Sequence, residues 1–392
     1  MFGGRERPVT EFRLKRFGMI MEPRPGDPNE VEGVLNPAAA RSPDGQLYLF
    51  PRLVARGNYS RIGIARVLFN SAGDPKGVER MGIVLEPEAD YELSEQGGGC
   101  EDPRISFVEP LQHYVMTYTA LSRRGPRIAI AISDDLFRWR RMGLVTFHPY
   151  DGIAFDGVDD KDASVFPTLI PGPLGRPVVA LLHRPLFPGT RPEEKVRRPR
   201  SHVTDPHRES IWISYCRVGA KGEEHRLGEF VAHHPLASPL AAWEQLKIGG
   251  GAPPVMCRHG WLVIYHGVHK LADEQAVSDG QTVRPKMAYS AGAMVLSREH
   301  PNKIVYRSRE PVLVPSGPLE CHGIVDDVVF PTGIDRRDDL GTPDRFDIYY
   351  GMADDRIGVA RLDVPTTLPR DGAVDVADAM TSAAPPPGDG VL

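Results

Sequence analysis

GWLVIYHGV (260–268) is the clearest of several short apolar stretches that decide the fold of this chain. It is rich in aromatic and β-branched residues, as buried β-strands are, and it is shorter than most helices. After a loop comes YSAGAMVLS (289–297), a stretch of small and β-branched residues. The same order recurs at LYLFPRLV and YSRIGIARVLF (47–69), HYVMTYTAL and PRIAIAISDD (113–135), and FDIYYGMA and DRIGVARL (346–362). The chain is therefore expected to form a series of strand pairs.

Counting SIWISYCRV (210–218) with its neighbours, about five such units follow one another at intervals of roughly 50 to 90 residues. Repeated antiparallel sheets at this spacing predict an all-β fold, a five-bladed β-propeller with a central active-site funnel. Two packed β-sandwich domains are the alternative. We predict one catalytic domain over 1–369 and a flexible tail over 370–392, which is small, polar and proline-rich. The charged segment 187–209 is interpreted as a surface loop, a lid or a homo-oligomer contact.

The composition excludes several classes of protein. A net charge of −5 argues against nucleic acid as a partner. No stretch approaches the roughly 20 apolar residues of a membrane helix, and the N-terminus lacks the apolar core of a signal peptide. The four cysteines are far apart, which favours a reducing, cytoplasmic setting over disulfides or zinc. The chain shows no metal cluster and no cofactor-binding glycine loop, so we expect no metal and no cofactor to be required.

The first candidate for chemistry is GGGCEDPRISF (97–107), where three glycines precede the acidic pair Glu101 and Asp102. A carboxylate mounted rigidly at the entrance of a strand, with a pKa raised by partial burial, suits a general acid. Arg104 can orient it or balance its charge. A structural Asp–Arg pair that closes a turn is an equally good interpretation of these residues taken alone.

Basic residues form the second set of candidates. Lys161 and Asp162 precede a buried strand in DKDASVFP (160–167), although a solvated turn is the simpler interpretation. Lys247 stands before a glycine-rich turn, and His266 lies near the end of an apolar strand. A lysine, a histidine and a glycine turn can bind an anion such as phosphate through charge and free N–H groups. A satisfied core histidine is the default for His266.

Arginines and strand-end carboxylates complete the candidates. Arg52 and Arg56 lie in LFPRLVARGNYS (49–60) and would point to the funnel or to solvent. Asp327 follows Asp326 in DDVVFPTG, and Asp354 lies in YYGMADD. Such carboxylates accept hydrogen bonds from sugar hydroxyls well, but they are also ordinary turn residues.

Taken together, these segments resemble glycoside hydrolase family 130, the β-mannoside phosphorylases and related β-mannosidases. The resemblance covers roughly residues 30–365, in the order of the family, and implies a five-bladed β-propeller. It is carried by Asn36-Pro37, PRLVARGNYS, GCEDPR, ISDDLFRW, DKDASVFP with ALLHRP, WEQLKIGGGAPP, GWLVIYHGV, DDVVFPTG and YYGMADDRIGVA.

The resemblance also implies roles for the candidates. Asp102 matches the catalytic acid, which protonates the glycosidic oxygen through a hydroxyl of the −1 sugar. Phosphate, a co-substrate, then attacks the anomeric carbon with inversion and yields mannose 1-phosphate. The substrate-binding positions are Asn36, Arg52, Asp354, Asp162 and Asp327, and the phosphate-binding positions are Arg56, Lys161, Lys247 and His266.

Phosphorolysis and hydrolysis differ in the residues they need. A phosphorylase needs cations for a dianion, whereas an inverting hydrolase needs a second carboxylate that activates water. No Glu replaces Lys247 or His266, which favours phosphorolysis of a β-mannooligosaccharide or mannosyl glycoside. The alternatives are an inverting β-mannosidase or other β-glycosidase with Asp159, Asp160 or Asp162 as its base, and a propeller that binds carbohydrate without catalysis.

Overall fold

The computed structural model describes residues 11–95, 97–187, 208–218, 221–271 and 286–370. Almost all regular structure in these ranges is β-strand, so the predicted all-β class is confirmed. The predicted tail over 370–392 lies outside the described residues except for Arg370, and so does most of the 187–209 loop. No helix among the described residues is long and apolar enough to cross a membrane.

The largest sheet has eight strands, in the order β2-β3-β4-β6-β7-β8-β9 with β5 on β4. Its halves are two antiparallel groups, β2–β5 and β6–β9, and their strands pair with each other only where Tyr59 and Ser60 lie parallel to Gly98 and Gly99. The strands are β2 (Gly33–Arg41), β3 (Leu47–Ala55), β4 (Tyr59–Phe69), β5 (Pro75–Leu85), β6 (Gly98–Val108), β7 (His113–Ser122), β8 (Gly125–Ser133) and β9 (Arg140–Leu144).

Three further sheets follow along the chain. The second contains β10 (Thr146–Phe147), β11 (Asp159–Val165), β12 (Ile170–Pro171), β13 (Pro177–Leu186), β14 (Ile211–Cys216) and β15 (Glu229–Ala237). The third contains β16 (Lys247–Gly250), β17 (Val255–Cys257), β18 (Gly260–Lys270), β19 (Met287–Leu296) and β20 (Ile304–Arg307). The fourth contains β21 (Val329–Arg336), β22 (Arg345–Met352), β23 (Arg356–Asp363) and β1 (Arg13–Met21). One short helix, α1 (Pro318–Cys321), and 3₁₀ turns at Glu109–Leu111, Glu224–Arg226, Ala242–Glu244 and Asp338–Leu340 lie between strands.

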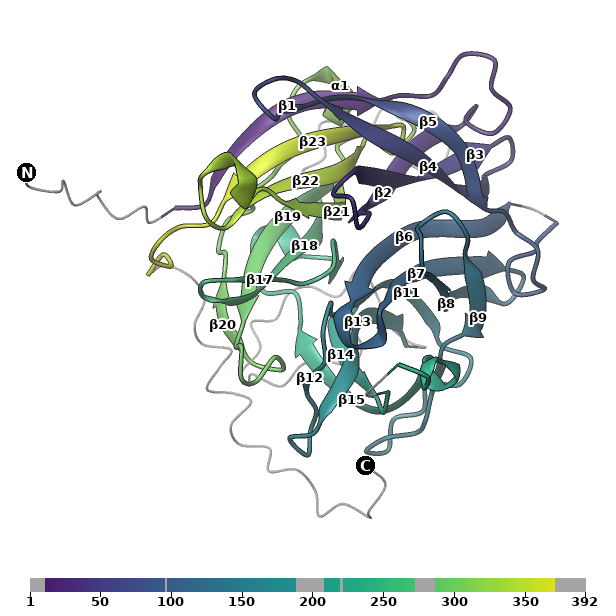
Figure 1. Cartoon of the computed structure of the whole chain (residues 1–392), viewed down its shortest axis with the longest axis vertical. Helices are drawn as coiled ribbons and strands as arrows, with labels where there is room; N and C mark the ends of the chain where they lie inside the picture. Colours follow the sequence, from purple (N-terminus) through teal and green to yellow (C-terminus); the bar gives the residue numbers. More distant parts are fainter. Residues whose placement is uncertain (1–10, 96, 188–207, 219–220, 272–285, 371–392) are drawn as a thin grey trace, which may run out of the picture.

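The N-terminal strand completes the C-terminal sheet. β1 pairs antiparallel with β23 from Arg13 opposite Asp363 to Met21 opposite Ile357. The two strands lie side by side in Figure 1. This pairing fixes the two ends of the folded chain to each other, although they are more than 300 residues apart in sequence.

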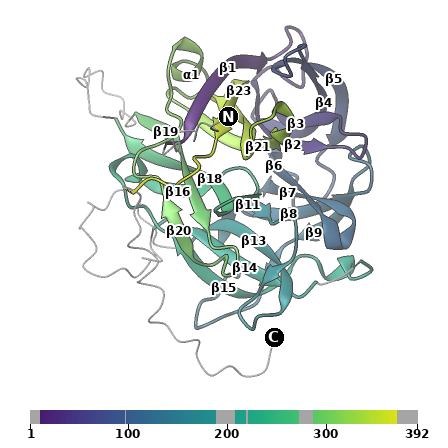
Figure 2. The ribbon, with the colours of Figure 1, turned by 60° about the vertical axis from the view of Figure 1, so that its left-hand side comes forward.

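The core consists of five apolar clusters, each between two successive groups of strands. One cluster, with Val34 and Leu49 facing Tyr349 and Val359, joins the last group to the first. The groups therefore follow one another in a closed series around the molecule (Figures 1 and 2). Hydrogen bonding itself gives four sheets rather than five, so the five blades around one axis remain a prediction.

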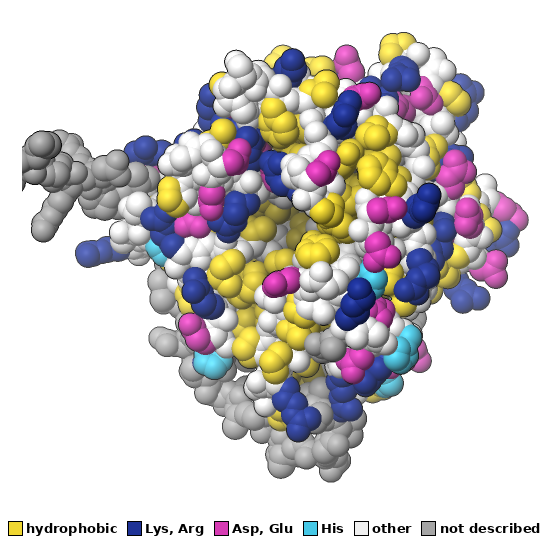
Figure 3. Space-filling model, viewed as in Figure 1, with side chains coloured by type: hydrophobic (Ala, Val, Ile, Leu, Met, Phe, Trp, Pro, Cys, Tyr) yellow, Lys and Arg dark blue, Asp and Glu magenta, His cyan; other side chains and the backbone are white. Residues whose placement is uncertain are grey.

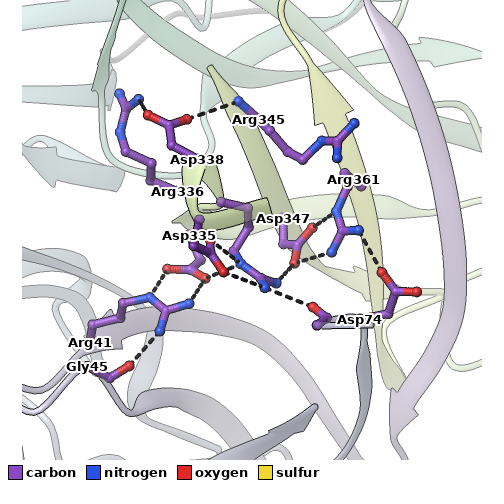
Figure 4. Close-up of polar contacts among 12 residues, drawn as sticks. Arg41, Gly45, Asp74, Asp335, Arg336, Asp338, Arg345, Asp347 and Arg361 are labelled. Carbon is purple, nitrogen blue, oxygen red and sulfur yellow. Dashed lines mark hydrogen bonds and ion pairs between the residues drawn. The ribbon is translucent and has the colours of Figure 1, made fainter. Parts of the chain in front are cut away.

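Buried charges tie the last sheet to the first. Asp347 on β22 is fully buried and accepts from Arg337 at 2.6 Å and from Arg361 at 2.8 Å. Arg361 also reaches Asp74 in the β4–β5 turn at 2.6 Å, and Arg41 on β2 pairs with Asp335 (Figure 4). Because a buried charge without its partner is costly, these linked ion pairs hold the last sheet and the first sheet in one arrangement.

Candidate active site

Three of the predicted site residues share an unusual backbone position. Asn36, Asp102 and Asp162 have φ angles of 44°, 47° and 58°, and each lies at a register shift in its strand, β2, β6 and β11. Asn and Asp tolerate this left-handed conformation better than most residues. A β-bulge changes the direction in which a side chain points, so that it no longer follows the alternation of the strand. The fold thus turns one polar side chain out of each of three neighbouring strands.

Asn36 and Arg52 hold the carboxylate of Asp102. The Nδ2 of Asn36 donates to Asp102 Oδ1 at 2.9 Å, and Arg52 Nη1 donates to the same oxygen at 3.3 Å. Arg104 Nη1 donates to the backbone carbonyl of Asp102 at 2.8 Å. Asp102 is 8% exposed, so its carboxylate is held rigidly with only a small surface open to solvent.

The prediction of a raised pKa for Asp102 is wrong. Burial alone would raise the pKa, but Arg52, Arg104 and the hydrogen bond from Asn36 together hold it below its ordinary value. The raised pKa belongs to Asp354 instead, where burial and the nearby charge of Asp102 bring it to about 6. A proton taken up by these two neighbouring carboxyls therefore goes first to Asp354.

Glu101 links two of the predicted cations. It accepts from Arg52 Nη2 at 2.6 Å, and its Oε2 lies 3.7 Å from Lys161 Nζ. Lys161 also lowers the pKa values of Asp102 and Asp354 by its charge. Lys161 therefore lies on the Asp102 side of the site.

A second group of charges surrounds Asp162. Arg184 on β13 donates through Nε to Asp162 Oδ2 at 2.6 Å and pairs through Nη1 with Glu209. Lys247 Nζ lies 4.0 Å from Glu209 Oε2, and His266 Nε2 lies 3.7 Å from Asp162 Oδ2. Asp162 and Lys247, predicted from separate stretches of sequence, are thus brought into one cluster.

Arg104 connects the two groups. Its Nη1 binds the carbonyl of Asp102, and its Nη2 lies 3.4 Å from Asp162 Oδ1. Its Nε and Nη2 also donate to the carbonyls of Gly251 and Gly250, at 3.1 Å and 3.2 Å. The glycine-rich turn predicted to offer N–H groups thus offers carbonyl oxygens to Arg104.

Gly249 and Gly251 are further constrained by the strand. The N–H of Gly251 donates to Ile264. A Cβ at Gly249 would collide with Asp162 and His266, so this glycine provides space for those side chains.

His266 is neutral in this environment. Burial and the charges of Arg184 and Lys247 outweigh Asp162 and lower its pKa to about 3. Its ring lies 4.6 Å from that of Phe330, and its Nδ1 is buried without a hydrogen-bond partner. Its assignment as a cation is therefore wrong, although a neutral imidazole can still donate a hydrogen bond to an anion.

Lys247 keeps a half-buried ammonium group at the edge of this cluster. Burial and the charge of Arg184 lower its pKa. The ammonium lies 5.6 Å from the centre of the Tyr289 ring, a cation–π geometry. Tyr289 was not a sequence candidate, because nothing in YSAGAMVLS separates it from an ordinary strand tyrosine.

Arg184 and Glu209 are the other site residues that sequence reasoning missed. Arg184 stands in ALLHRP, where its position next to a buried histidine in an apolar strand was the available signal. Glu209 ends the segment 187–209, which was interpreted as a surface loop, a lid or a homo-oligomer contact and not as part of the site.

The remaining predicted residues lie at the margin. Arg56 is exposed in the turn between β3 and β4, where its charge acts on Glu32. Among the contacts of the described residues, none joins Arg56 to Lys247 or Arg184. Asp327 adopts a φ of 58°, and its carbonyl accepts from the backbone of Tyr289 at 2.9 Å, so it lies beside the Lys247 edge.

The three candidate bases for hydrolysis all have partners. Asp159 pairs with Arg127, and Asp160 Oδ2 lies 2.6 Å from Nδ1 of His183. Asp162 is held by Arg184 as described. Among the described residues, no group of three or more His, Cys, Asp and Glu side chains could hold a metal ion.

The face drawn in Figure 3 is hollowed near its middle, with acidic and basic side chains around the hollow. Hydrophobic side chains also line this hollow, so it offers both apolar and polar surface to a ligand.

Comparison with known proteins gives a consistent result. The family model of glycoside hydrolase family 130, described as beta-1,4-mannooligosaccharide phosphorylase, matches residues 6–179 and 202–368. A 1,2-beta-oligomannan phosphorylase of Thermoanaerobacter sp. (strain X514) is 30% identical over 364 residues, which cover 90% of this chain and 98% of that protein. A beta-1,4-mannooligosaccharide phosphorylase of Ruminococcus albus is 36% identical over 128 residues, 33% of this chain and 34% of that protein.

Solved structures share the fold. The beta-1,2-mannobiose phosphorylase of Listeria innocua superposes with a TM-score of 0.64 at 21% identity, over 89% of this chain and 96% of that one. A structure described with glycoside hydrolases that target beta-1,2 mannosidic linkages in Candida mannan superposes with a TM-score of 0.62 at 22% identity, over 91% and 95%.

Proposed function

Since the chain belongs to glycoside hydrolase family 130, we propose that it is an inverting β-mannoside phosphorylase. It cleaves a β-mannooligosaccharide with phosphate and releases mannose 1-phosphate and the acceptor sugar. The observation that supports this most is the connection of a rigidly held Asp102 to Arg184 through Arg104 and Asp162, and from Arg184 to Lys247 through Glu209. An acid and an anion-binding group within one charge network are the parts that phosphorolysis needs.

Asp102 is proposed as the proton donor, acting through a hydroxyl of the −1 mannosyl unit. Asn36, Arg52 and Asp354 would hold that unit. Because its lowered pKa keeps Asp102 ionised near neutral pH, Asp102 must gain its proton when the substrates bind. A phosphate dianion that binds near Arg104 and Lys161 offsets the charges that now lower the pKa of Asp102, and so favours the protonated acid.

Arg184, Lys247 and the neutral His266 are proposed to bind the phosphate. Arg104 and Asp162 connect this group to the acid, Lys161 would reach the phosphate from the Asp102 side, and Asp327 would contact the substrate from the edge. A phosphate oxygen then attacks the anomeric carbon as the glycosidic C–O bond breaks. The departing oxygen takes the proton, and the configuration inverts.

We infer β-1,2-linked mannosides as the substrate class. The support is the relative named for 1,2-β-oligomannan, which matches over nearly its whole length, whereas the relative named for the β-1,4 linkage matches over only a third.

The test is incubation with β-1,2- and β-1,4-mannobiose, with and without phosphate, followed by assays for mannose 1-phosphate and free mannose. We expect phosphate-dependent formation of mannose 1-phosphate, faster from the β-1,2 substrate, and its loss in Asp102→Asn. Asp338→Asn, an exposed carboxylate paired with Arg336, is the matched control and should keep full activity. Equal release of free mannose without phosphate would contradict the proposal.

A further inference from the structure

We propose that Glu209 is an internal anion that competes with phosphate for Arg184 and Lys247 and thereby sets the affinity for phosphate. This inference rests on the proposed function, because it concerns the same cations. Neither the interpretation of the segment 187–209 nor the strand pattern predicted this role for Glu209.

The contacts of Glu209 resemble those that a bound phosphate would make. Its Oε2 pairs with Nη1 of Arg184 and lies 4.0 Å from Nζ of Lys247, and its side chain is only 12% exposed. Arginine and lysine together are a common arrangement for binding phosphate oxygens. In the structure, a carboxylate of the chain itself is therefore paired with these two cations.

Glu209 is not needed to hold Arg184 in place. The Nε of Arg184 donates to Asp162 Oδ2 at 2.6 Å, and Asp162 is itself fixed by Arg104 through its other oxygen. Both Asp162 and Arg184 are buried. Neutralising Glu209 thus leaves the guanidinium with a charged, buried partner that orients it.

The backbone of Glu209 is fixed, so only its side chain has to move. The N–H of Ile248, next to Lys247, donates to the carbonyl of Glu209 at 3.2 Å. The neighbouring Arg208 donates to the carbonyls of Gln245 at 2.7 Å and Pro239 at 3.2 Å. Rotation of the Glu209 side chain away from its cations is therefore enough to free them.

The balance of charge favours this exchange. Arg104, Arg184 and Lys247 face two carboxylates, Asp162 and Glu209, so the cluster has little excess positive charge. A phosphate dianion that enters beside both carboxylates is repelled by them. Asp162 is buried and held by two arginines, whereas Glu209 pairs with one arginine, Arg184, and lies 4.0 Å from Lys247, so Glu209 is the carboxylate that can withdraw.

The test is Glu209→Gln, which keeps the shape of the side chain and removes its charge. We expect the KM for phosphate and the dissociation constant of inorganic phosphate by calorimetry to fall, by roughly fivefold. Glu209→Asp keeps the charge on a shorter side chain, so its KM and its dissociation constant for phosphate should lie between those of the wild type and of Glu209→Gln. Glu79→Gln, which removes an exposed ion pair with Arg66, is the matched control and should change neither value.

Phosphate binding that is unchanged or weaker in Glu209→Gln would overturn the proposal, because a residue that only positions Arg184 would weaken binding when it is lost. If the wild type released mannose without phosphate and Glu209→Gln lost this release, the proposal would also be overturned, since Glu209 would then act as the base of a hydrolase. Calorimetry needs no turnover. An absence of phosphorolysis would therefore count against the proposed function alone, while tighter phosphate binding would still support the role of Glu209.

Discussion

Replacing Asp354 by Asn should stabilise the folded chain at neutral pH while having much less effect near pH 4. Burial and the charge of Asp102 raise the pKa of Asp354 from 3.8 to about 6 in the folded state. Between these values the folded chain keeps a proton that the unfolded chain has released. The stability of the wild type therefore falls as the pH rises through this window. Asn carries no charge at any pH and avoids this loss.

The structure sets the size of the effect. A pKa that differs by 1 between the folded and the unfolded chain corresponds to about 1.4 kcal/mol of stability. The rise of the Asp354 pKa from 3.8 to about 6 therefore sets an upper bound of about 3 kcal/mol on the gain in the free energy of unfolding. The side chain of Asp354 is only partly shielded from water. We therefore expect a gain of about 1–2 kcal/mol above pH 6.

Urea unfolding of both proteins at pH 4, 5, 6 and 7.5 tests this expectation. The difference in the free energy of unfolding should grow with pH and level off above pH 6. Asp338→Asn shows how much the loss of a surface carboxylate contributes by itself. A difference that is constant with pH, or that shrinks as the pH rises, would refute the reasoning. The variant should also lose activity, because Asp354 is proposed to hold the mannosyl unit.

Three further outcomes are expected. Gly249→Ala should reduce phosphorolysis by at least about tenfold in kinetic assays, because its Cβ collides with Asp162. Lys247→Ala should raise the KM for phosphate by about tenfold or more, whereas Arg56→Ala, in an exposed turn, should leave that KM unchanged. Asp347→Asn should lower the free energy of unfolding by about 2 kcal/mol in urea titrations, because it removes the buried carboxylate that Arg337 and Arg361 share and leaves them only their other acidic partners.

Local patterns in the sequence predicted the strands well. The stretch 260–268 lies within β18, and 289–297 overlaps β19, its antiparallel neighbour. The pairing of β1 with β23 could not be predicted, because nothing local in the first 21 residues indicates a partner more than 300 residues away. Segments that form one hairpin can be recognised in sequence, but closure between the chain ends depends on the whole fold.

The site was predicted to the extent that each residue stood out in its own segment. Asp102 and Lys247 did, and the structure connects them. Glu209 did not, since its importance comes only from the cations that other strands bring to it. The pKa of Asp102 was predicted in the wrong direction, because the sequence shows burial and the nearby Arg104 but not the approach of Arg52 and Asn36 from other strands.

The repeated units explain why polar side chains converge at all. Asn36, Asp102 and Asp162 lie on different strands but occupy the same kind of bulge, each in the left-handed conformation. In the third sheet, glycines around Gly249 leave the space into which Asp162 and His266 project. One backbone irregularity, repeated with different residues, thus supplies an amide, two carboxylates and a gap, which is how a repetitive fold can build an asymmetric site.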